Sequence, residues 1–589
     1  MNEMDLIVAG HAGQGLQVIS RTLAWMLVRA GYYVFLSQDV MSRIRGGHNF
    51  ARLRVGTEPV YADGDAAQVL VALDPALVER HIPHLAPDAV VVTDAAGTLP
   101  EGVNAVRLPF ADLAREPVMV NAVAVGASLA LVGLDPAGLG EIFSGQFRGK
   151  GEEVVRRNVA AAEAGFRAVV EGGKGCCPPK LAGGVPGERV LISGAEALAL
   201  GAIAAGVRVV TGYPMSPATP IVEYCFRHAQ EAGLIVEQTE DEVSAANLAI
   251  GAAFAGARSM VCTAGGGFCL MNEALSLAGM TETPLVLCVG MRPGPATGMA
   301  TRTEQADLLF SIYAGHGEFP RAVLTPADAE QAFHAAQDAF RIAEKYQTPV
   351  IILFDQFMAD ALWTVERSRL RSGVASPSTL VPDSAAIKPY SYRRYEVTES
   401  GVSPMVLPGT AQQLVYADSD EHTEEGHIAE SAAIRLLMVN KRNAKLAGIR
   451  RELAVPKVEA EVKAEAEVKA RVKVEVKVEA EGEEKAETLV FCFGSSRGVV
   501  SEALKRLRAK GLNAAMVHLN HIWPFPVDAV AGLVGKEKRA LTVEQNYSGQ
   551  LAQLLLQECG VRAAGTVRRF DGRQFTVAEV EAGLEEMMR

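Results

Sequence analysis

The sequence predicts a multidomain α/β protein whose domains are built on doubly wound parallel sheets. Short apolar runs alternate along the chain with stretches of helical periodicity, a pattern that favours parallel strands with helices on both faces. The chain has 589 residues, of which 49% are hydrophobic and 21% charged, so it is long enough to form several cores. At roughly 150 residues per domain, the length suggests about four domains.

Residues 1–175 are expected to form the first α/β domain. An apolar run at 4–9 precedes the glycine-rich sequence GHAGQG, which is followed by an apolar-periodic stretch over 16–30. This order predicts a strand, a tight turn and a helix. The other elements expected here are strands within 60–74 and 86–94, helices at 121–135 and 152–170, and then a Gly- and Pro-rich linker at 176–189.

Residues 190–370 are expected to form a second, doubly wound α/β domain. Helical stretches such as 241–256 separate its apolar runs. In such a fold the loops that follow the strands lie at the carboxyl edge of the sheet, where ligands bind. The predicted strands lie within 207–213, 233–238, 257–265, 283–290 and 348–354.

The remaining sequence contains one more predicted domain. Residues 371–456 show no strong periodicity and are expected to connect folded parts. The stretch 457–487 carries charges on nearly every second residue, so it cannot form a core and is predicted to be a solvated spacer. Residues 488–589 again combine apolar runs with helical stretches and predict a third α/β domain, which leaves three folded domains rather than four.

Charge and cysteine content exclude several classes of protein. The net charge of −12 argues against a nucleic-acid binder, because phosphate contacts need clustered Lys and Arg. No run approaches the ~18 apolar residues of a membrane span, and no secretory signal is expected. None of the eight cysteines forms a C-x-x-C pair, so neither an iron–sulfur cluster nor a zinc site is expected on this chain. Scattered cysteines fit a reducing, cytoplasmic location.

A proline-rich loop and a group of carboxylates are the first candidate site residues. The loop TGYPMSPAT (211–219) follows a predicted strand, and its prolines stiffen the backbone around Ser216. It is either a ligand-binding loop or a plain turn. The carboxylates between 237 and 242 are ordinary partners of a helix dipole. Glu242, however, begins an Ala- and Gly-rich helix that must pack tightly, so an inward-facing carboxylate there is a proton-relay candidate.

Glycines and arginines follow the next two predicted strands. The glycines of TAGGGF (263–268) permit a close backbone approach to a ligand. The long loop 291–308 holds Arg292 and Arg302, and arginine binds carboxylates with two parallel hydrogen bonds. A solvated surface charge is the alternative interpretation of a loop arginine.

The motifs YPMSP, EQTEDE, TAGGGF and TRTEQ, in this order, resemble the α subunit of 2-oxoacid:ferredoxin oxidoreductases. The similar variant has a γ domain fused ahead of α, as in many 2-oxoglutarate:ferredoxin oxidoreductase α subunits. The resemblance covers nearly the whole chain except the charged spacer. Further similar segments are GHAGQG and SRIRGGHNFARLRV of the γ domain, YADSDEHTEEGH of the connecting region, and HLNHIWPFP and VEQNYSGQL of a transketolase-C-like domain.

The resemblance implies a fold and a role for each domain. It identifies 1–175 as the γ-like domain, 190–370 as the pyrimidine-binding domain of a thiamine diphosphate enzyme, 371–456 as the connecting region and 488–589 as the transketolase-C-like domain. It implies oxidative decarboxylation of a 2-oxoacid, with 2-oxoglutarate favoured, to acyl-CoA and CO2. Electrons pass to ferredoxin, or the reaction runs in reverse.

The resemblance also implies roles for individual residues. Glu242 matches the glutamate that hydrogen-bonds the aminopyrimidine ring and promotes its imino tautomer, with Pro214 and Gly267 also on the cofactor side. Ser216 and Arg302 match substrate-binding residues, and Arg302 would hold the carboxylate. Glu242, Arg302 and Ser216 are therefore the catalytic candidates. The sequence has YPMSP for the family's YPITP and TAGGGF for its TSGPGF, which leaves the substrate preference open.

The basic sequence SRIRGGH of the γ-like domain contains a second candidate site. Arg43, Arg45 and His48 are suited to hold an anionic group such as a phosphate of coenzyme A. A tight turn that contacts another subunit is at least as good an interpretation. No metal site is expected on this chain.

Two missing features imply a partner subunit. The family's diphosphate site needs a GDG motif that holds a divalent metal, and this chain has none; nor does it have cysteines spaced for a cluster. A β subunit is therefore expected to supply the GDG motif, Mg²⁺ and a [4Fe-4S] cluster, with the active site shared between α and β.

Other substrates and one other class of protein stay open. Pyruvate, branched-chain and aryl 2-oxoacids are alternatives to 2-oxoglutarate. A non-catalytic scaffold subunit is the alternative to an enzyme, although Glu242 and Arg302 argue against it. A self-sufficient transketolase-like enzyme is disfavoured by the missing GDG motif.

Overall fold

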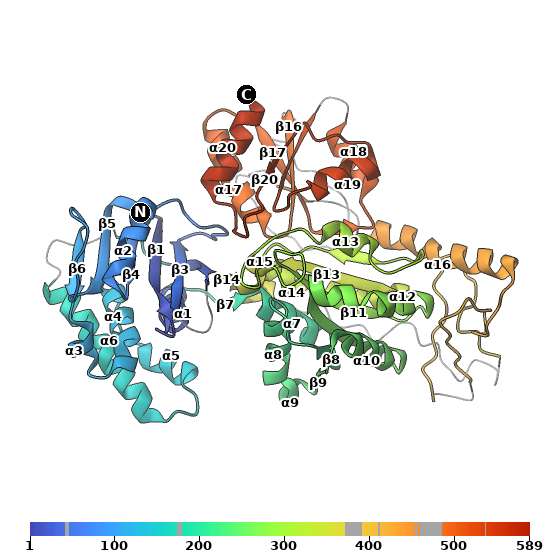
Figure 1. Ribbon diagram of the computed structural model, residues 1–589, viewed down its shortest axis with the longest axis horizontal. Coiled ribbons are helices and arrows are strands. Elements are labelled where there is room, and N and C mark those ends of the chain that lie inside the picture. Colours follow the sequence, from blue (N-terminus) through green and yellow to red (C-terminus); the bar gives the residue numbers. More distant parts are fainter. Residues whose placement is uncertain are drawn as a thin grey trace. The chain divides into compact units, whose positions relative to one another are not determined.

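The computed structural model describes residues 1–41, 46–172, 180–371, 391–409, 413–453, 457–459, 486–535 and 538–589. The chain divides into two compact units. Both consist of sheets with flanking helices, so the predicted α/β class is confirmed (Figure 1). No described helix is long and apolar enough to cross a membrane. The first unit is Met1–Ser193, Asp360–Leu370 and Thr576–Ala578; the second is Gly194–Ala359, Arg371–Phe575 and Glu579–Arg589.

The first unit is built on a mixed eight-stranded sheet with the order β6-β5-β4-β1-β3-β2-β14-β7. The strands from β6 to β1 are parallel, and those from β1 to β7 pair antiparallel. Its strands are β1 (Glu3–Ala12), β2 (Tyr33–Asp39), β3 (Gly46–Gly56), β4 (Ala67–Ala72), β5 (Leu85–Asp94), β6 (Ala105–Leu108), β7 (Arg189–Ser193) and β14 (Leu362–Glu366). Its helices are α1 (Leu16–Arg29), α2 (Val78–His81), α3 (Phe110–Ala114), α4 (Val120–Val132), α5 (Leu139–Gln146) and α6 (Glu152–Gly172).

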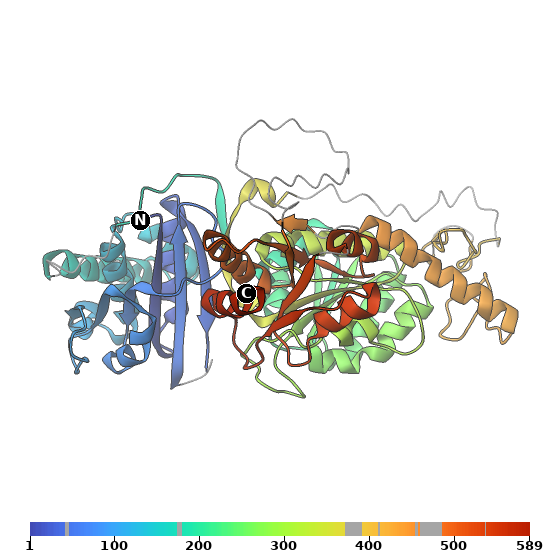
Figure 2. The same cartoon turned by 90° about the horizontal axis from the view of Figure 1, so that it is seen from above.

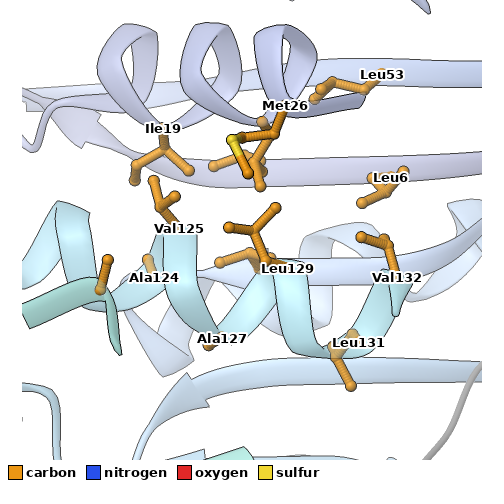
Figure 3. Close-up of a cluster of buried hydrophobic side chains, with 14 of the residues drawn as sticks. Leu6, Ile19, Met26, Leu53, Ala124, Val125, Ala127, Leu129, Leu131 and Val132 are labelled. Carbon is orange, nitrogen blue, oxygen red and sulfur yellow. The ribbon is translucent and has the colours of Figure 1, made fainter. Parts of the chain in front are cut away.

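The core of this unit lies between the sheet and the helices α1 and α4. Figure 3 shows Ile19 and Met26 of α1 and Val125 and Leu129 of α4 pointing toward one another, with Leu6 of β1 and Leu53 of β3 nearby. Nearly every residue of α4 is buried, because α6 covers its other side. The helices meet at glycines: a Cβ on Gly126 would lie 1.7 Å from the carbonyl oxygen of Ala162.

Strand β14 returns to this sheet from a distant part of the chain. It pairs antiparallel with β2 and β7, and Val34 N donates to Thr364 Oγ1 at 2.9 Å. Arg189 and Glu366 form an ion pair at 3.2 Å on the same strands. Strand β14, at the end of the second predicted domain (190–370), therefore completes the sheet of the first unit.

The second unit contains a seven-stranded sheet with the order β18-β12-β13-β11-β10-β8-β9. All neighbours are parallel except β12 and β18. Every residue of β10, β11 and β13 is buried, as expected for parallel strands covered by helices on both faces. The strands are β8 (Val209–Gly212), β9 (Ile235–Gln238), β10 (Ser259–Ala264), β11 (Leu285–Met291), β12 (Ala322–Leu324), β13 (Pro349–Asp355) and β18 (His521–Trp523). The helices are α7 (Gly194–Ala204), α8 (Thr219–Arg227), α9 (Ala229–Ala232), α10 (Glu242–Phe254), α11 (Gly265–Leu270), α12 (Asn272–Met280), α13 (Leu308–Tyr313), α14 (Ala329–Tyr346) and α15 (Gln356–Asp360).

The C-terminal part of the second unit forms a five-stranded sheet with the order β15-β17-β16-β19-β20. It also supplies β18 to the seven-stranded sheet, where β18 pairs antiparallel with β12. Its strands are β15 (Lys457–Glu459), β16 (Thr488–Phe493), β17 (Ala514–Leu519), β19 (Arg539–Glu544) and β20 (Gly565–Arg568), and its helices are α17 (Ser496–Ala509), α18 (Val527–Val534), α19 (Gln550–Cys559) and α20 (Val577–Met588).

The first residues of the predicted spacer are structured. Residues 457–459 form β15, which pairs antiparallel with β17, so the spacer interpretation does not hold for them. Most of the spacer, 460–485, lies outside the described residues, as do 176–179 of the predicted linker.

Helix α16 (Ala432–Glu452, orange in Figures 1 and 2) is held by buried ion pairs. Lys441 Nζ lies 2.7 Å from Glu282 Oε1, and Lys445 contacts the same carboxylate. Arg394 donates to the backbone oxygen of Glu282 at 2.7 Å. Glu282 is only 1% exposed, so these charges are removed from water and satisfy each other.

Candidate active site

The predicted site residues follow neighbouring parallel strands of the seven-stranded sheet. Pro214 and Ser216 follow β8, Glu242 follows β9, Gly267 follows β10 and Arg302 follows β11. Because β9, β8, β10 and β11 are adjacent and parallel, their carboxyl ends lie at one edge of the sheet. This edge is the usual ligand-binding position in doubly wound folds.

Glu242 is a buried carboxylate at the first position of α10. Asp241 caps the helix by accepting a hydrogen bond from Ser244 N at 2.7 Å, which also lowers the pKa of Asp241. Glu242 is 4% exposed, and its Oε1 has no hydrogen-bond partner among the described residues. An unpartnered buried oxygen costs about 1–3 kcal/mol, so this one is suited to receive a donor from a ligand.

Gly267 gives Glu242 the space to lie inward. A Cβ on Gly267 would lie 2.7 Å from Glu242 Oε1 and 2.2 Å from Thr263 Oγ1, closer than any side chain allows. The glycines of TAGGGF form the first turn of α11, directly after β10. The absence of a side chain at Gly267 thus allows the Glu242 side chain to approach the backbone of α11.

The loop after β8 is held by residues that follow β11. Arg292 Nη1 donates to the backbone oxygen of Ser216 at 2.8 Å. Pro217 is buried against β11, since a Cβ on Gly290 would lie 2.5 Å from its Cγ. Pro214 is exposed and Ser216 half-buried, so both are accessible. The sequence singled out Arg292 as a carboxylate partner, but it binds the backbone of the proline-rich loop.

Arg302 is half-buried in the loop that leads to α13. This loop ends at Asp307, whose Oδ2 lies 2.5 Å from the place that a Cβ on Gly265 would occupy. Burial raises the pKa of Asp307 to about 6, and burial also raises the pKa of Glu304. Sequence reasoning missed Asp307; its only signal is an acidic residue two positions after the TRTEQ motif.

His48 lies on β3 of the first unit. Its ring packs on those of His81 and Phe50, with centroids 4.8 and 5.5 Å away. Burial and the charge of Arg80 lower the pKa of His48, so its imidazole can donate a hydrogen bond but carries little charge at neutral pH. Arg43 and Arg45 lie outside the described residues. Across the described ranges, no group of His, Cys, Asp or Glu is arranged to hold a metal ion.

Three family models match the chain in sequence order. Residues 5–168 match the pyruvate ferredoxin/flavodoxin oxidoreductase model, and 200–441 match the thiamine diphosphate-binding model of pyruvate flavodoxin/ferredoxin oxidoreductase. Residues 486–580 match core domain II of pyruvate:ferredoxin oxidoreductase. The subunit alpha of 2-oxoacid:ferredoxin oxidoreductase 2 from Aeropyrum pernix is 30% identical, over 100% of this chain and 98% of its own length.

The chain belongs to the family of 2-oxoacid:ferredoxin oxidoreductase α subunits. The predicted resemblance and the predicted enzyme class are therefore confirmed: this is a subunit of an oxidoreductase. The 2-oxoglutarate oxidoreductase subunit KorA of Mycobacterium tuberculosis is 29% identical, covering 93% of this chain and 86% of its own. A solved 2-oxoglutarate:ferredoxin oxidoreductase from Magnetococcus marinus matches with a TM-score of 0.88 and 30% identity over 100% of both chains; 2-oxoglutarate, coenzyme A and succinyl-CoA are bound in it.

Proposed function

We propose that this α subunit binds thiamine diphosphate together with a β subunit and acts on 2-oxoglutarate. The complex would form acyl-CoA and CO2 and pass electrons to ferredoxin, or run the reaction in reverse. Full-length similarity to an enzyme whose structure contains 2-oxoglutarate and coenzyme A supports this substrate over pyruvate, branched-chain and aryl 2-oxoacids. The KorA relatives support it as well.

The observation that carries the proposal is the unpartnered Oε1 of Glu242. A buried carboxylate oxygen fits a ring nitrogen of the aminopyrimidine, which it would hold by a hydrogen bond while exchanging a proton with it. Pro214 lies exposed at the same edge, beside the proposed position of the ring. When bound, thiamine diphosphate supplies a nucleophilic carbon that attacks the 2-oxo carbon.

Two other residues would orient the substrate. Arg302 is suited to bind its carboxylate with two parallel hydrogen bonds. The Ser216 hydroxyl is suited to hydrogen-bond the substrate, because Arg292 fixes the backbone of its loop. Exclusion of water would be shared with the partner chain.

The β subunit would complete the site. It would hold the diphosphate through Mg²⁺ and carry a [4Fe-4S] cluster, since this chain has no GDG motif. Coenzyme A would accept the acyl group, and the γ-like domain with Arg43, Arg45 and His48 is the proposed place of contact for it.

A substrate panel tests the proposed reaction. The complex of the α chain with its β subunit should reduce a viologen dye with 2-oxoglutarate and coenzyme A, with a higher kcat/KM than with pyruvate, branched-chain or aryl 2-oxoacids. A complex that binds thiamine diphosphate in calorimetry but oxidises none of these would contradict the substrate class. Lack of thiamine diphosphate binding would support the scaffold alternative.

The Glu242→Gln substitution tests the cofactor site. It keeps the size of the side chain but removes the proton acceptor, so turnover should fall by roughly 10²–10⁴-fold. Steady-state dye reduction by the αβ complex measures this. The matched control is Glu240→Gln, two residues earlier and exposed, where only a surface hydrogen bond from Ser244 changes. Equal activity of the two variants would remove the proposed role of Glu242.

A further inference from the structure

The segment that carries Arg302 is bound by the C-terminal part of the same unit. Thr303 N donates to the carbonyl oxygen of Gly572 at 3.1 Å, and Gln305 N donates to that of Gln545 at 2.7 Å. Gly572 and Gln545 belong to the C-terminal α/β region, on the segments that follow β20 and β19. The C-terminal α/β region therefore fixes the backbone of Thr303 and Gln305, the first and third residues after Arg302.

The side chain of Gln305 also binds the segment after Arg302 to the C-terminal α/β region. Its side chain is 0% exposed, and Nε2 donates to Asp355 Oδ2 at 3.2 Å and to the carbonyl oxygen of Phe493 at 3.1 Å. Its Oε1 accepts from Ser496 Oγ at 3.1 Å and from Gln545 N at 3.2 Å. All four hydrogen-bonding positions of the amide are used, and a satisfied buried network permits one conformation.

Gly572 lies directly against the side chain of Arg302. Its φ is +80°, and a Cβ there would lie 3.1 Å from Arg302 Cβ and 3.3 Å from Met299 Sδ. The turn around it is stabilised by Arg569 and Asp571, whose side chains form two hydrogen bonds of 2.8 and 2.9 Å. A rigid turn thus contacts the stem of Arg302 with no side chain between them.

We propose that the C-terminal α/β region positions the Arg302 guanidinium, with Gly572 and Gln305 as its positioning residues. This inference rests on the proposed function, in which Arg302 binds the carboxylate of the 2-oxoacid. The turn around Gly572 then sets how far Arg302 reaches into the site. It acts on substrate affinity through Arg302 and makes no contact with the substrate itself.

The strength with which an arginine binds a carboxylate through two hydrogen bonds depends steeply on the position of its guanidinium. A displacement of about 1 Å in a substrate-binding group can cost roughly 100-fold in rate or affinity. A methyl group on Gly572 would press on Arg302 Cβ and Met299 Sδ and displace them by a few tenths of an ångström, which shifts the guanidinium at the end of the side chain. The contact falls on Arg302 and Met299, so the effect is expected on 2-oxoacid binding.

The Gly572→Ala variant tests the proposal in the αβ complex, with Gly511→Ala as its matched control. Gly511 lies in the same region with a φ of +84°, and a Cβ there meets no atom within 4 Å, so it reproduces the backbone strain alone. Gly572→Ala should raise the KM for 2-oxoglutarate roughly 3- to 10-fold, because a shift of a few tenths of an ångström costs less than the roughly 100-fold of an about 1 Å misplacement. The KM for coenzyme A and the thiamine diphosphate content should match those of Gly511→Ala. Equal KM values for 2-oxoglutarate in the two variants would overturn the proposal.

A double substitution separates this inference from the proposed function. Arg302→Ala should raise the KM for 2-oxoglutarate by itself; if it does not, the role of Arg302 fails. If it does, Gly572→Ala in the Arg302→Ala background should change the KM no further, since it acts through the missing side chain. Additive effects would show that Gly572 acts by another route and would overturn the positioning role.

Discussion

Two carboxylates approach the glycine-rich helix α11 from different segments. Glu242 lies against Gly267, and Asp307 lies against Gly265. The inward position of Glu242 could be predicted, because the Ala- and Gly-rich helix that follows it must pack closely. The burial of Asp307 could not, since it depends on where the long loop returns to the sheet, and no local pattern encodes that contact.

Asp307 should make stability depend on pH. Its pKa is raised from 3.8 to about 6 by burial, so the folded chain holds the proton more tightly than the unfolded chain. Its contribution to stability is complete below about pH 4 and is lost as the pH rises through 6. Asp307→Asn, which removes the charge, should therefore gain about 1–2 kcal/mol relative to wild type above pH 6 and nothing near pH 4. Urea unfolding of both proteins between pH 4 and 8 measures this difference, and parallel pH profiles would contradict the expectation.

The strands of both central sheets are the elements that the sequence predicts best. The runs at 257–265, 283–290 and 348–354 became β10, β11 and β13, because continuous Val, Ile and Leu are typical of buried parallel strands. Strand β14 was not foreseen as part of the first sheet. Its sequence, LWTVE, is an ordinary strand pattern, and only tertiary contacts with β2 and β7 decide which sheet it joins.

The contact between α4 and α6 depends on Gly126 of α4 and Gly165 of α6. Gly126→Ala would place a methyl group 1.7 Å from the carbonyl oxygen of Ala162, so the helices must separate and stability should fall by about 1–3 kcal/mol or more. The control is Gly145→Ala in α5, where no atom lies within 4 Å and the helix should gain up to about 1 kcal/mol. Thermal unfolding of the two variants should thus shift in opposite directions. Equal midpoints would mean that α4 and α6 are not in close contact.

The buried lysines of helix α16, Lys441 and Lys445, share the carboxylate of Glu282. Burial alone would raise the pKa of Glu282, but the charges of Lys445 and Lys441 outweigh it and lower the pKa to about 2. The carboxylate therefore stabilises the fold above about pH 4.5, and this contribution is lost as the pH falls toward 2. Glu282→Gln would leave buried lysines without a counter-charge and should cost about 3–5 kcal/mol at pH 7.

Chemical denaturation at pH 7 measures the loss for Glu282→Gln. The control is Glu273→Gln, whose carboxylate is 81% exposed and pairs with His316 at 3.0 Å; surface pairs contribute about 0–1 kcal/mol. Similar values for both variants would show that the buried lysines do not need the Glu282 charge.

For the whole molecule, motif order was the most informative part of the sequence. It predicted the family, the α/β class and the segments that meet at the carboxyl edge of one sheet. Motif order could not predict that the C-terminal region binds the loop of Arg302. The hydrogen bonds from Thr303 and Gln305 go to backbone oxygen atoms, and no side-chain pattern in the sequence indicates them.

The short strand β18 protects the edge of the seven-stranded sheet. It covers β12, which would otherwise be the edge strand of the seven-stranded sheet. An uncovered edge presents free backbone donors and acceptors to the edges of other molecules and favours aggregation. Proteolysis or truncation that removed the C-terminal region would therefore leave the edge of the seven-stranded sheet uncovered and the remaining part prone to self-association.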